Sequence, residues 1–193
     1  KISEIAYKKC REKINELKGC ESAVSLDISK IESVAEYLII KCGEITPLAL
    51  QKLLYYSQAF CKLFTDSYLF EEDCEAWVHG PVYRCIYEKY RVFGRSVIDT
   101  DDNELLLDEI EEHVINSVVR YFGCYSAKSL EEMTHCEKPW IITRKGLKKN
   151  EACNRIIEKE LIDSYFIEIK NKYNIVNIDD IKQYSSSLFK NIY

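Results

Sequence analysis

Apolar residues recur every three or four positions along most of this 193-residue chain, the spacing that gathers them on one face of an α-helix. The clearest such stretches are residues 31–39, 47–64, 106–121 and 157–172. Capping signals agree, because Ser29 and Glu32 can form a capping box and Thr46-Pro47 can open the next helix. Only six glycines and three prolines are present, which disfavours a loop-rich β architecture. The sequence predicts a mainly α, compact multi-helix domain.

One segment departs from the helical spacing. Residues 74–78, Cys-Glu-Ala-Trp-Val, predict one short β element, which the turn signal Gly80-Pro81 ends. We expect Pro81 to open a further helix, since proline is favoured in the first helical turn. After an acidic loop, the helix that follows is expected to turn Ile110 inward together with Val114.

The length of the chain fits one domain with short appendages. We predict a helical domain over residues 29–172 and a C-terminal tail helix over residues 173–193. Residues 1–28 are expected to form an N-terminal helical extension, or the linker of an upstream module, since the chain begins with Lys1 rather than Met.

Charge and hydropathy narrow the class of partner. The net charge of −5 at pH 7 removes the global electrostatic argument for nucleic acid, so we expect no direct nucleic-acid binding by this chain. No stretch approaches the roughly 20 apolar residues that cross a bilayer, and the first residues lack the apolar region of a signal peptide. We therefore expect no membrane contact and a cytoplasmic location.

Acidic residues gather in two places. Eight acids and no base lie between Arg95 and Arg120, and residues 71–75 hold four more acids. These groups are either solvated helix faces or an acidic surface that attracts a basic protein partner.

The nine cysteines are odd in number, spread evenly and without a Cys-x-x-Cys pair. Zinc ligands are grouped at short spacing so that four of them can converge, and this pattern is missing here. We expect reduced, mostly buried thiols, no metal site and a reducing compartment.

Nucleotide-binding, metalloprotease and serine-hydrolase motifs are absent from the chain. His135 precedes Cys136, but a cysteine hydrolase also needs an orienting group and an oxyanion hole, and the sequence nominates neither. We read His135 as a structural residue of a packed junction, His79 as part of a turn and His113 as an exposed helix position. The prediction is a protein without catalytic residues or cofactor, with an enzyme built on His135 and Cys136 as a lesser hypothesis.

Three blocks of sequence together carry a family resemblance. The first is the run from Ile45 to Gln58, and the second combines Glu75-Ala76-Trp77 with Gly80-Pro81-Val82. The third contains Thr134-His135, Pro139-Trp140 and Arg144, with Thr143 where the family usually has a small residue. In this order and spacing they resemble the Panacea domain, the family of SocA-like antitoxins and phage-associated GepA-like proteins, over about residues 31–168.

This resemblance implies a largely helical fold without known catalytic activity. It also implies the antitoxin of a bacterial or prophage toxin–antitoxin pair, which neutralises a cognate protein toxin, encoded by an adjacent gene, through direct binding. The alternative is the sensor or dimerisation domain of a transcriptional regulator whose DNA-binding module lies upstream. A homodimer is open under either hypothesis.

The matched blocks nominate positions for partner binding or for the family motif. These are Thr46, Gln51, Lys52, Tyr55, Tyr56, Glu75, Trp77, Gly80, Pro81, Thr134, His135, Pro139, Trp140 and Arg144. We expect the apolar members, including Trp77 and Trp140, to belong to the core with Leu50 and Val82. We expect partner contact from the polar members rather than from the apolar ones, that is, from Gln51, Lys52, Tyr56, Glu75, His135 and Arg144. Buried hydrogen bonds that hold helices together explain these residues about as well as partner contact does.

Overall fold

The structure, a computed structural model, describes residues 29–99 and 107–192. Its elements are α2 (Lys30–Cys42), α3 (Pro47–Thr65), β1 (Cys74–Trp77), β2 (Gly80–Val82), α4 (Arg84–Tyr90), the 3-10 helix η1 (Arg91–Phe93), α5 (Glu109–Tyr121), α6 (Ala127–His135), α7 (Lys138–Thr143), β3 (Ile156–Ile157), α8 (Lys159–Lys172), η2 (Ile178–Asp180) and α9 (Ile181–Lys190). The predicted mainly α fold is confirmed. The helix expected within residues 1–28 lies outside the described residues.

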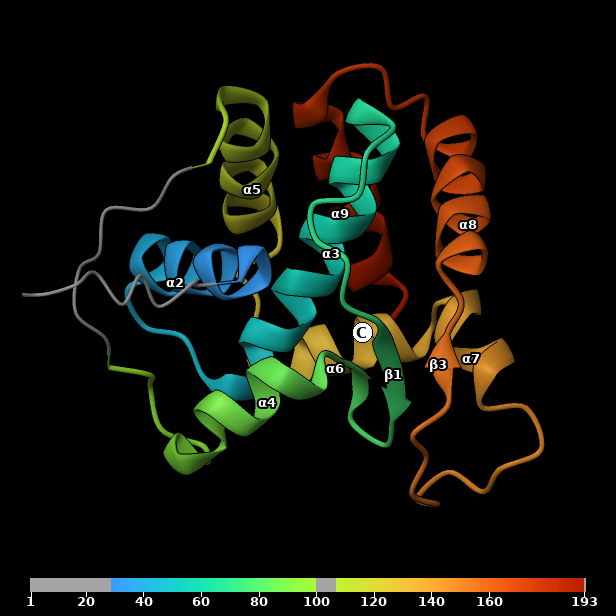
Figure 1. Ribbon diagram of the computed structural model, residues 1–193. Helices are drawn as coiled ribbons and strands as arrows, with labels where there is room; N and C mark the ends of the chain where they lie inside the picture. The colour runs from blue at the N-terminus through green and yellow to red at the C-terminus, as the bar shows by residue number, and fades with distance from the viewer. Residues whose placement is uncertain (1–28, 100–106, 193) are drawn as a thin grey trace, which may run out of the picture.

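Helix α3 forms the centre of the molecule. Its N-cap Thr46 accepts a hydrogen bond from the Ala49 amide at 3.4 Å, and Pro47 stands at the start of the helix, as predicted. Every residue from Ala49 to Cys61 is buried. Helices α2, α5, α6 and α8 all contact α3, with α2 and α5 on one side and α8 on the other (Figure 1). A helix enclosed in this way needs apolar residues on several faces, which its sequence has.

A small sheet packs beside the lower half of α3. Strand β1 is antiparallel to β2, with Ala76 opposite Pro81, and to β3, with Cys74 opposite Ile157, in the order β2-β1-β3. The β element near residues 74–78 is confirmed. The helix expected to begin at Pro81 is wrong, because Gly80 at φ +95° turns the chain back and Pro81 lies in edge strand β2, where no ladder N–H is required of it. Helix α4 begins later, at Arg84.

The core is aromatic where α3 meets α5, α8 and α9. Tyr56 stacks on Phe122 with ring centroids 4.1 Å apart, and Phe166 packs edge-on against Phe60 at 5.1 Å. Tyr184 of α9 is 1% exposed and contacts the same cluster. The domain boundary predicted between residues 172 and 173 stays a prediction. Helix α9, which lies beyond this boundary, supplies Tyr184 to the core.

Two other expectations are wrong. Ile110 is 56% exposed, because the buried contacts of α5 begin one turn later, at Val114. Among the seven described cysteines only Cys61 and Cys74 are buried, although all seven are free thiols. The remaining five lie at helix ends and in connections, where Cys42 and Cys153 pack only partly against the core and Cys85, Cys124 and Cys136 are exposed.

Within the described ranges, no group of three or more His, Cys, Asp or Glu residues is placed to hold a metal ion. None of the helices described here combines the length and the apolar character needed to cross a membrane.

Candidate functional site

Polar side chains on α3 hold the β1–β2 hairpin in place. The Gln51 side chain pairs with the backbone of Tyr83, accepting from its N–H at 2.8 Å and donating to its carbonyl at 3.3 Å. Lys52 donates from Nζ to the Pro81 carbonyl at 2.8 Å. Because both side chains are buried and bonded within the chain, they position β2 and do not face a partner.

Lys52 lies in a tight junction between α3, α6 and the hairpin. A Cβ placed on Gly80 would come within 2.7 Å of Thr134 Oγ1 and 2.8 Å of Lys52 Cε, so only glycine fits between them. Burial lowers the pKa of Lys52 to about 7, while Cys74 and Glu131 nearby act in the opposite direction. The junction explains why Lys52, Gly80 and Thr134 all appear in the matched blocks.

A second buried group joins α3, α7 and α9. Glu137, the N-cap residue of α7, is fully buried, and its Oε1 accepts hydrogen bonds from the hydroxyls of Tyr56, at 3.0 Å, and Tyr184. Burial raises the pKa of Glu137 to about 7, although the tyrosine hydroxyls around it, including Tyr55, favour the charged form. This network therefore accounts for Tyr56, whereas the buried Tyr55 hydroxyl forms no hydrogen bond with the residues that the structure describes.

The sequence did not point to Glu137. It lies between an exposed Cys136 and an exposed Lys138, so its local pattern resembles that of a surface glutamate. Only the tertiary contacts of Tyr56 and Tyr184, 81 and 47 residues away along the chain, reveal its role.

The two tryptophans of the chain meet at the surface. Trp140 Nε1 donates to the Trp77 carbonyl at 2.8 Å, and Trp77 Nε1 donates to Glu75 Oε2 at 2.8 Å. Arg84 binds the same Glu75 carboxylate through two nitrogens, at 2.8 and 2.6 Å. We call Glu75, Trp77, Arg84, His135, Trp140 and Arg144 the tryptophan junction.

Both indoles are half-buried, so the expectation that they belong to the core is wrong. An indole N–H requires an acceptor when it is covered, and the acceptors here lie at the edge of the sheet. The Trp77 ring also contacts neighbouring side chains: Tyr87 packs edge-on against Trp77 at 4.7 Å, and Arg84 lies 5.3 Å from the Trp77 ring centroid.

Arg144 ties the junction to the following loop. Its Nη1 donates to the Ala76 carbonyl at 2.8 Å and its Nη2 donates to the Glu151 carbonyl at 2.6 Å. The guanidinium also lies over the Trp140 ring, 5.1 Å from its centroid. A buried arginine with these contacts connects α7, β1 and residues 146–151.

His135 stacks on Trp140 with ring centroids 4.1 Å apart, in agreement with the structural interpretation. Burial lowers the pKa of His135 to about 4, so the ring is neutral at pH 7. Partial burial raises the pKa of Cys136, which disfavours a reactive thiolate. The pair lacks the charge state of an activated cysteine and histidine.

Two open hollows flank the tryptophan junction. The first, of about 670 Å³, is lined by Trp77, Val78, His79, Arg84 and residues 150–154 of the loop. The second, of about 780 Å³, lies between α6, α7, residues 147–149 and the end of the chain after α9. The loop that Arg144 holds separates the two.

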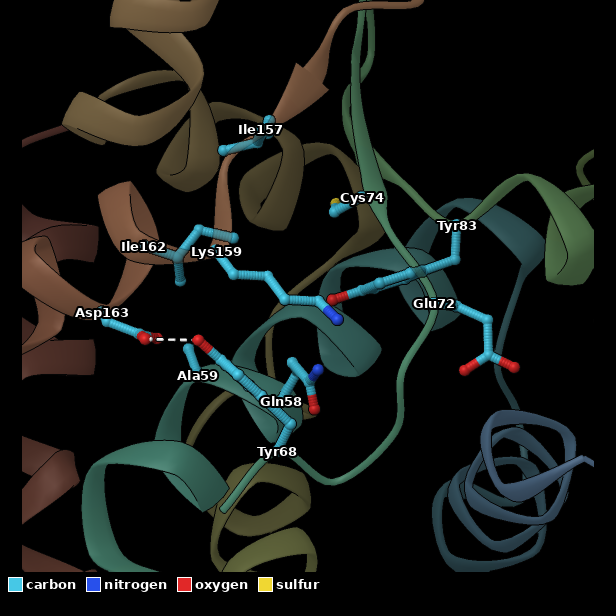
Figure 2. A pocket seen from close by; sticks show the side chains of 10 residues that line it. All are labelled: Gln58, Ala59, Tyr68, Glu72, Cys74, Tyr83, Ile157, Lys159, Ile162 and Asp163. Atoms are coloured by element: carbon cyan, nitrogen blue, oxygen red, sulfur yellow. Dashed lines mark hydrogen bonds between the residues drawn. The ribbon is translucent and has the colours of Figure 1, made fainter. Parts of the chain in front are cut away.

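Figure 2 shows a third, much smaller cavity between α3, β1 and α8. It measures about 10 Å³, which is the space of one water molecule. Tyr68 closes one side through a 2.6 Å hydrogen bond to Asp163, and Lys159 extends across it toward Tyr83 (Figure 2). This cavity is too small for a substrate or cofactor.

The nominated residues fall into an interior and a surface set. Nine are buried: Gln51, Lys52, Tyr55, Tyr56, Gly80, Pro81, Thr134, Pro139 and Arg144. Glu75, Trp77, His135 and Trp140 are half-buried and meet in the tryptophan junction. Thr46 lies apart, at the start of α3. Partner contact remains a prediction for the second set.

The acidic groups are partly neutralised within the chain. Glu75 pairs with Arg84 at 2.6 Å, Glu111 pairs with Lys30 at 2.6 Å, and Lys159 lies 3.6 Å from Glu71. These ion pairs favour the interpretation of solvated, internally paired faces. Residues 100–106, which belong to the group between Arg95 and Arg120, lie outside the described residues.

His113 is exposed, as expected. His79 lies in the turn between β1 and β2, as expected, and its Nδ1 lies 3.0 Å from Glu131 Oε1.

The comparisons with known proteins agree with this architecture. No curated protein and no solved structure gave a significant match to the chain. The family model described as "Antitoxin SocA-like, Panacea domain" matches residues 50–141, which run from α3 through the hairpin into α7. The match contains Trp77, His135 and Trp140 of the tryptophan junction. Over residues 50–141 the chain is therefore similar to the SocA-like Panacea domain family.

Proposed function

We propose that this chain is an antitoxin that neutralises a cognate protein toxin, encoded by an adjacent gene, by binding it directly in the cytoplasm. The family match over residues 50–141 carries the proposal. The proposal assigns the chain no catalytic step and no cofactor.

The tryptophan junction supports a binding role. Tryptophan and arginine are enriched at the energetic centres of protein interfaces, where large rings lie in partly formed pockets. Trp77 and Trp140 are half-buried, held by hydrogen bonds and bordered by two open hollows. Because their geometry is already fixed, a partner that covers them loses little conformational entropy on binding.

Expression of the adjacent open reading frame, with and without this chain, tests the proposal. We expect growth arrest by the neighbour alone, growth restored by co-expression, and co-purification of the two proteins. Growth arrest that persists although this chain is expressed and folded would refute the antitoxin function. Binding to its own promoter by a longer form, without rescue, would support the regulator instead.

A matched pair of variants locates the binding surface. Ile141 is 49% exposed and lines the second hollow, whereas Val92 is 82% exposed and follows α4. Both variants add one negative charge at an exposed site. We expect Ile141→Asp to weaken rescue, because Ile141 lines the second hollow, and Val92→Asp to retain it, because Val92 does not. Equal rescue by the two variants would place the interface elsewhere.

A further inference from the structure

The segment from Lys138 to Arg155 is strongly basic, although the whole chain carries a net charge of −5. It holds six bases, Lys138, Arg144, Lys145, Lys148, Lys149 and Arg155, against the single acid Glu151. Three of these bases, Arg144, Lys148 and Lys149, line the second hollow.

Little of this positive charge is neutralised within the chain. Arg144 and Arg155 donate to backbone carbonyls, those of Ala76 and Glu151 for Arg144 and those of Thr143 and Lys145 for Arg155. Within the part of the chain that the structure describes, no carboxylate oxygen lies within 4.0 Å of Nζ of the three lysines in residues 145–149. Among the residues that the structure describes, Lys138 alone of the six forms an ion pair, with Glu168.

The acids near the hollow are already engaged. The Glu151 carboxylate accepts a hydrogen bond from the Lys148 amide at 3.1 Å. Glu132, which lines the opposite wall, lies 3.6 Å from Lys128. The side chains of Lys148 and Lys149 are therefore available to bind the carboxylates of a partner.

The same hollow is also lined by apolar side chains. Trp140, Ile141, Leu147 and Ile192 line it, and Ile141 remains 49% exposed. The chain end after α9 brings Ile192 beside α6 and α7, so a concave surface forms from segments far apart in sequence. The exposed lysines and the apolar side chains of this one hollow together match a ligand that combines carboxylates with large apolar side chains.

We propose that the second hollow docks an acidic, partly apolar segment of a partner protein. The carboxylates of the bound segment contact Lys148 and Lys149, and an apolar side chain of the same segment covers Trp140 and Ile141. This inference rests on the proposed function for the identity of the partner as a toxin, and it adds which segment of the toxin is bound.

A polypeptide fits this surface better than a nucleic acid does. Nucleic acid presents a continuous row of phosphates, which need an extended basic track. Here the bases that line the hollow are Arg144, Lys148 and Lys149, and they share its lining with apolar residues and with Glu132. The net charge of −5 also opposes the long-range approach of a polyanion.

Binding of labelled probes to the purified full chain tests the surface. The probes are a short fluorescein-labelled peptide in which Glu and Asp alternate with Leu and Phe, the same peptide with Lys in place of the acids, and a single-stranded RNA of equal length. We expect the acidic peptide to bind, the basic peptide not to bind, and the affinity to fall with added salt. Tighter binding of the RNA than of the acidic peptide would overturn the proposal.

Charge reversal at Lys148 and Lys149 provides the matched comparison. Lys148 and Lys149 are exposed and their side chains make no hydrogen bond or ion pair with other residues that the structure describes, so Lys148→Glu/Lys149→Glu should fold normally. Arg95→Glu/Lys182→Glu changes the net charge equally at exposed positions away from the hollow. We expect at least about a tenfold rise in Kd for the first pair and an unchanged Kd for the second. Equal Kd values would overturn the proposal.

The rescue assay separates the two proposals. If wild type fails to restore growth, the proposed function fails, whatever the peptide result. If wild type and Lys148→Glu/Lys149→Glu restore growth equally, the antitoxin function stands and the docking surface is wrong. Rescue lost in the Lys148→Glu/Lys149→Glu variant alone supports both.

Discussion

Lys52 and Glu137 are both fully buried, and neither forms an ion pair within 4.0 Å in residues 29–99 and 107–192, which the structure describes. Lys52 donates to the Pro81 carbonyl, and Glu137 accepts from the hydroxyls of Tyr56 and Tyr184. Burial moves both pKa values to about 7, downward for the lysine and upward for the glutamate. At the scale of single residues, the interior therefore contains two groups whose charge changes near neutral pH.

The variant Glu137→Gln should change the pH dependence of stability. The folded pKa, about 7, lies above the ordinary value of 4.5, so the folded state binds the extra proton between these two values. This contribution to stability is complete below pH 4.5 and is lost as the pH rises through 7. We expect the variant to gain on the order of 3 kcal/mol relative to wild type between pH 4.5 and 8. Urea unfolding across this range measures it, and parallel pH profiles would contradict it.

Gly80 and Gly146 offer a comparison of two glycines with positive φ. Gly80 has φ +95° and no room for a Cβ, whereas Gly146 has φ +88° and no heavy atom within 4 Å of that position. Gly146→Ala should cost about 1 kcal/mol, from backbone strain alone. Gly80→Ala should cost at least about 2 kcal/mol more, because Thr134 and the buried Lys52 must also move. Thermal unfolding of both variants measures the difference, and equal losses would refute the steric argument.

At the scale of elements, α3 serves as a template for the chain that follows it. Gln51 pairs with the backbone of Tyr83, and Gln58, two turns further along, pairs with the backbone of Leu69 and Phe70. A glutamine amide offers one acceptor and a donor, so it can satisfy backbone groups as a neighbouring strand would. These contacts fix both ends of the segment that contains the hairpin.

Gln58→Leu should therefore be strongly destabilising. It leaves the amides of Leu69 and Phe70 and the Phe70 carbonyl buried without their partner. We expect a loss of about 2–4 kcal/mol in the free energy of unfolding. The exposed Gln183 on α9 is the control, and Gln183→Leu should change stability by less than about 0.5 kcal/mol. Similar losses in the two variants, measured by urea unfolding, would contradict the template role.

At the scale of the whole molecule, Arg144 links the sheet, α7 and the loop between the two hollows. A lysine in its place keeps the charge but cannot bond the Ala76 and Glu151 carbonyls together or stack on Trp140 in the same way. We expect Arg144→Lys to raise the rate of tryptic cleavage at Lys148 and Lys149 about tenfold, through easier opening of the loop. Arg120→Lys, at an exposed position of α5, should leave the rate unchanged. If Arg144→Lys is cleaved in the loop at the wild-type rate, the contacts of Arg144 are not what holds the loop in place.

Much of the fold was predictable from local sequence. The capping box at Ser29, the Thr46 cap and Pro47 mark helix starts through bonds made within a few residues, and the structure has helices where they indicate. Pro81 was misread because a proline before an apolar helical pattern suits both a helix start and an edge strand. Two tertiary contacts decide for the edge strand. Pro81 pairs with Ala76 across the sheet, and its carbonyl accepts a hydrogen bond from Lys52.

The candidate site was predicted only as a set of residues. The matched blocks contain Trp77, His135 and Trp140, yet nothing in them distinguishes these surface rings from the buried Tyr55 and Tyr56. Helical spacing says which residues share a face, but burial depends on what packs against that face.

The sequence by itself determined the helices, the first strand and the family resemblance, because each depends on residues close together in the chain. The tertiary structure alone decided that Glu137 is a core residue, that the two indoles meet at the surface, and that basic and apolar side chains line one hollow together. These features depend on distances between residues tens of positions apart. Such distances follow from the packing of whole elements, which no local pattern encodes.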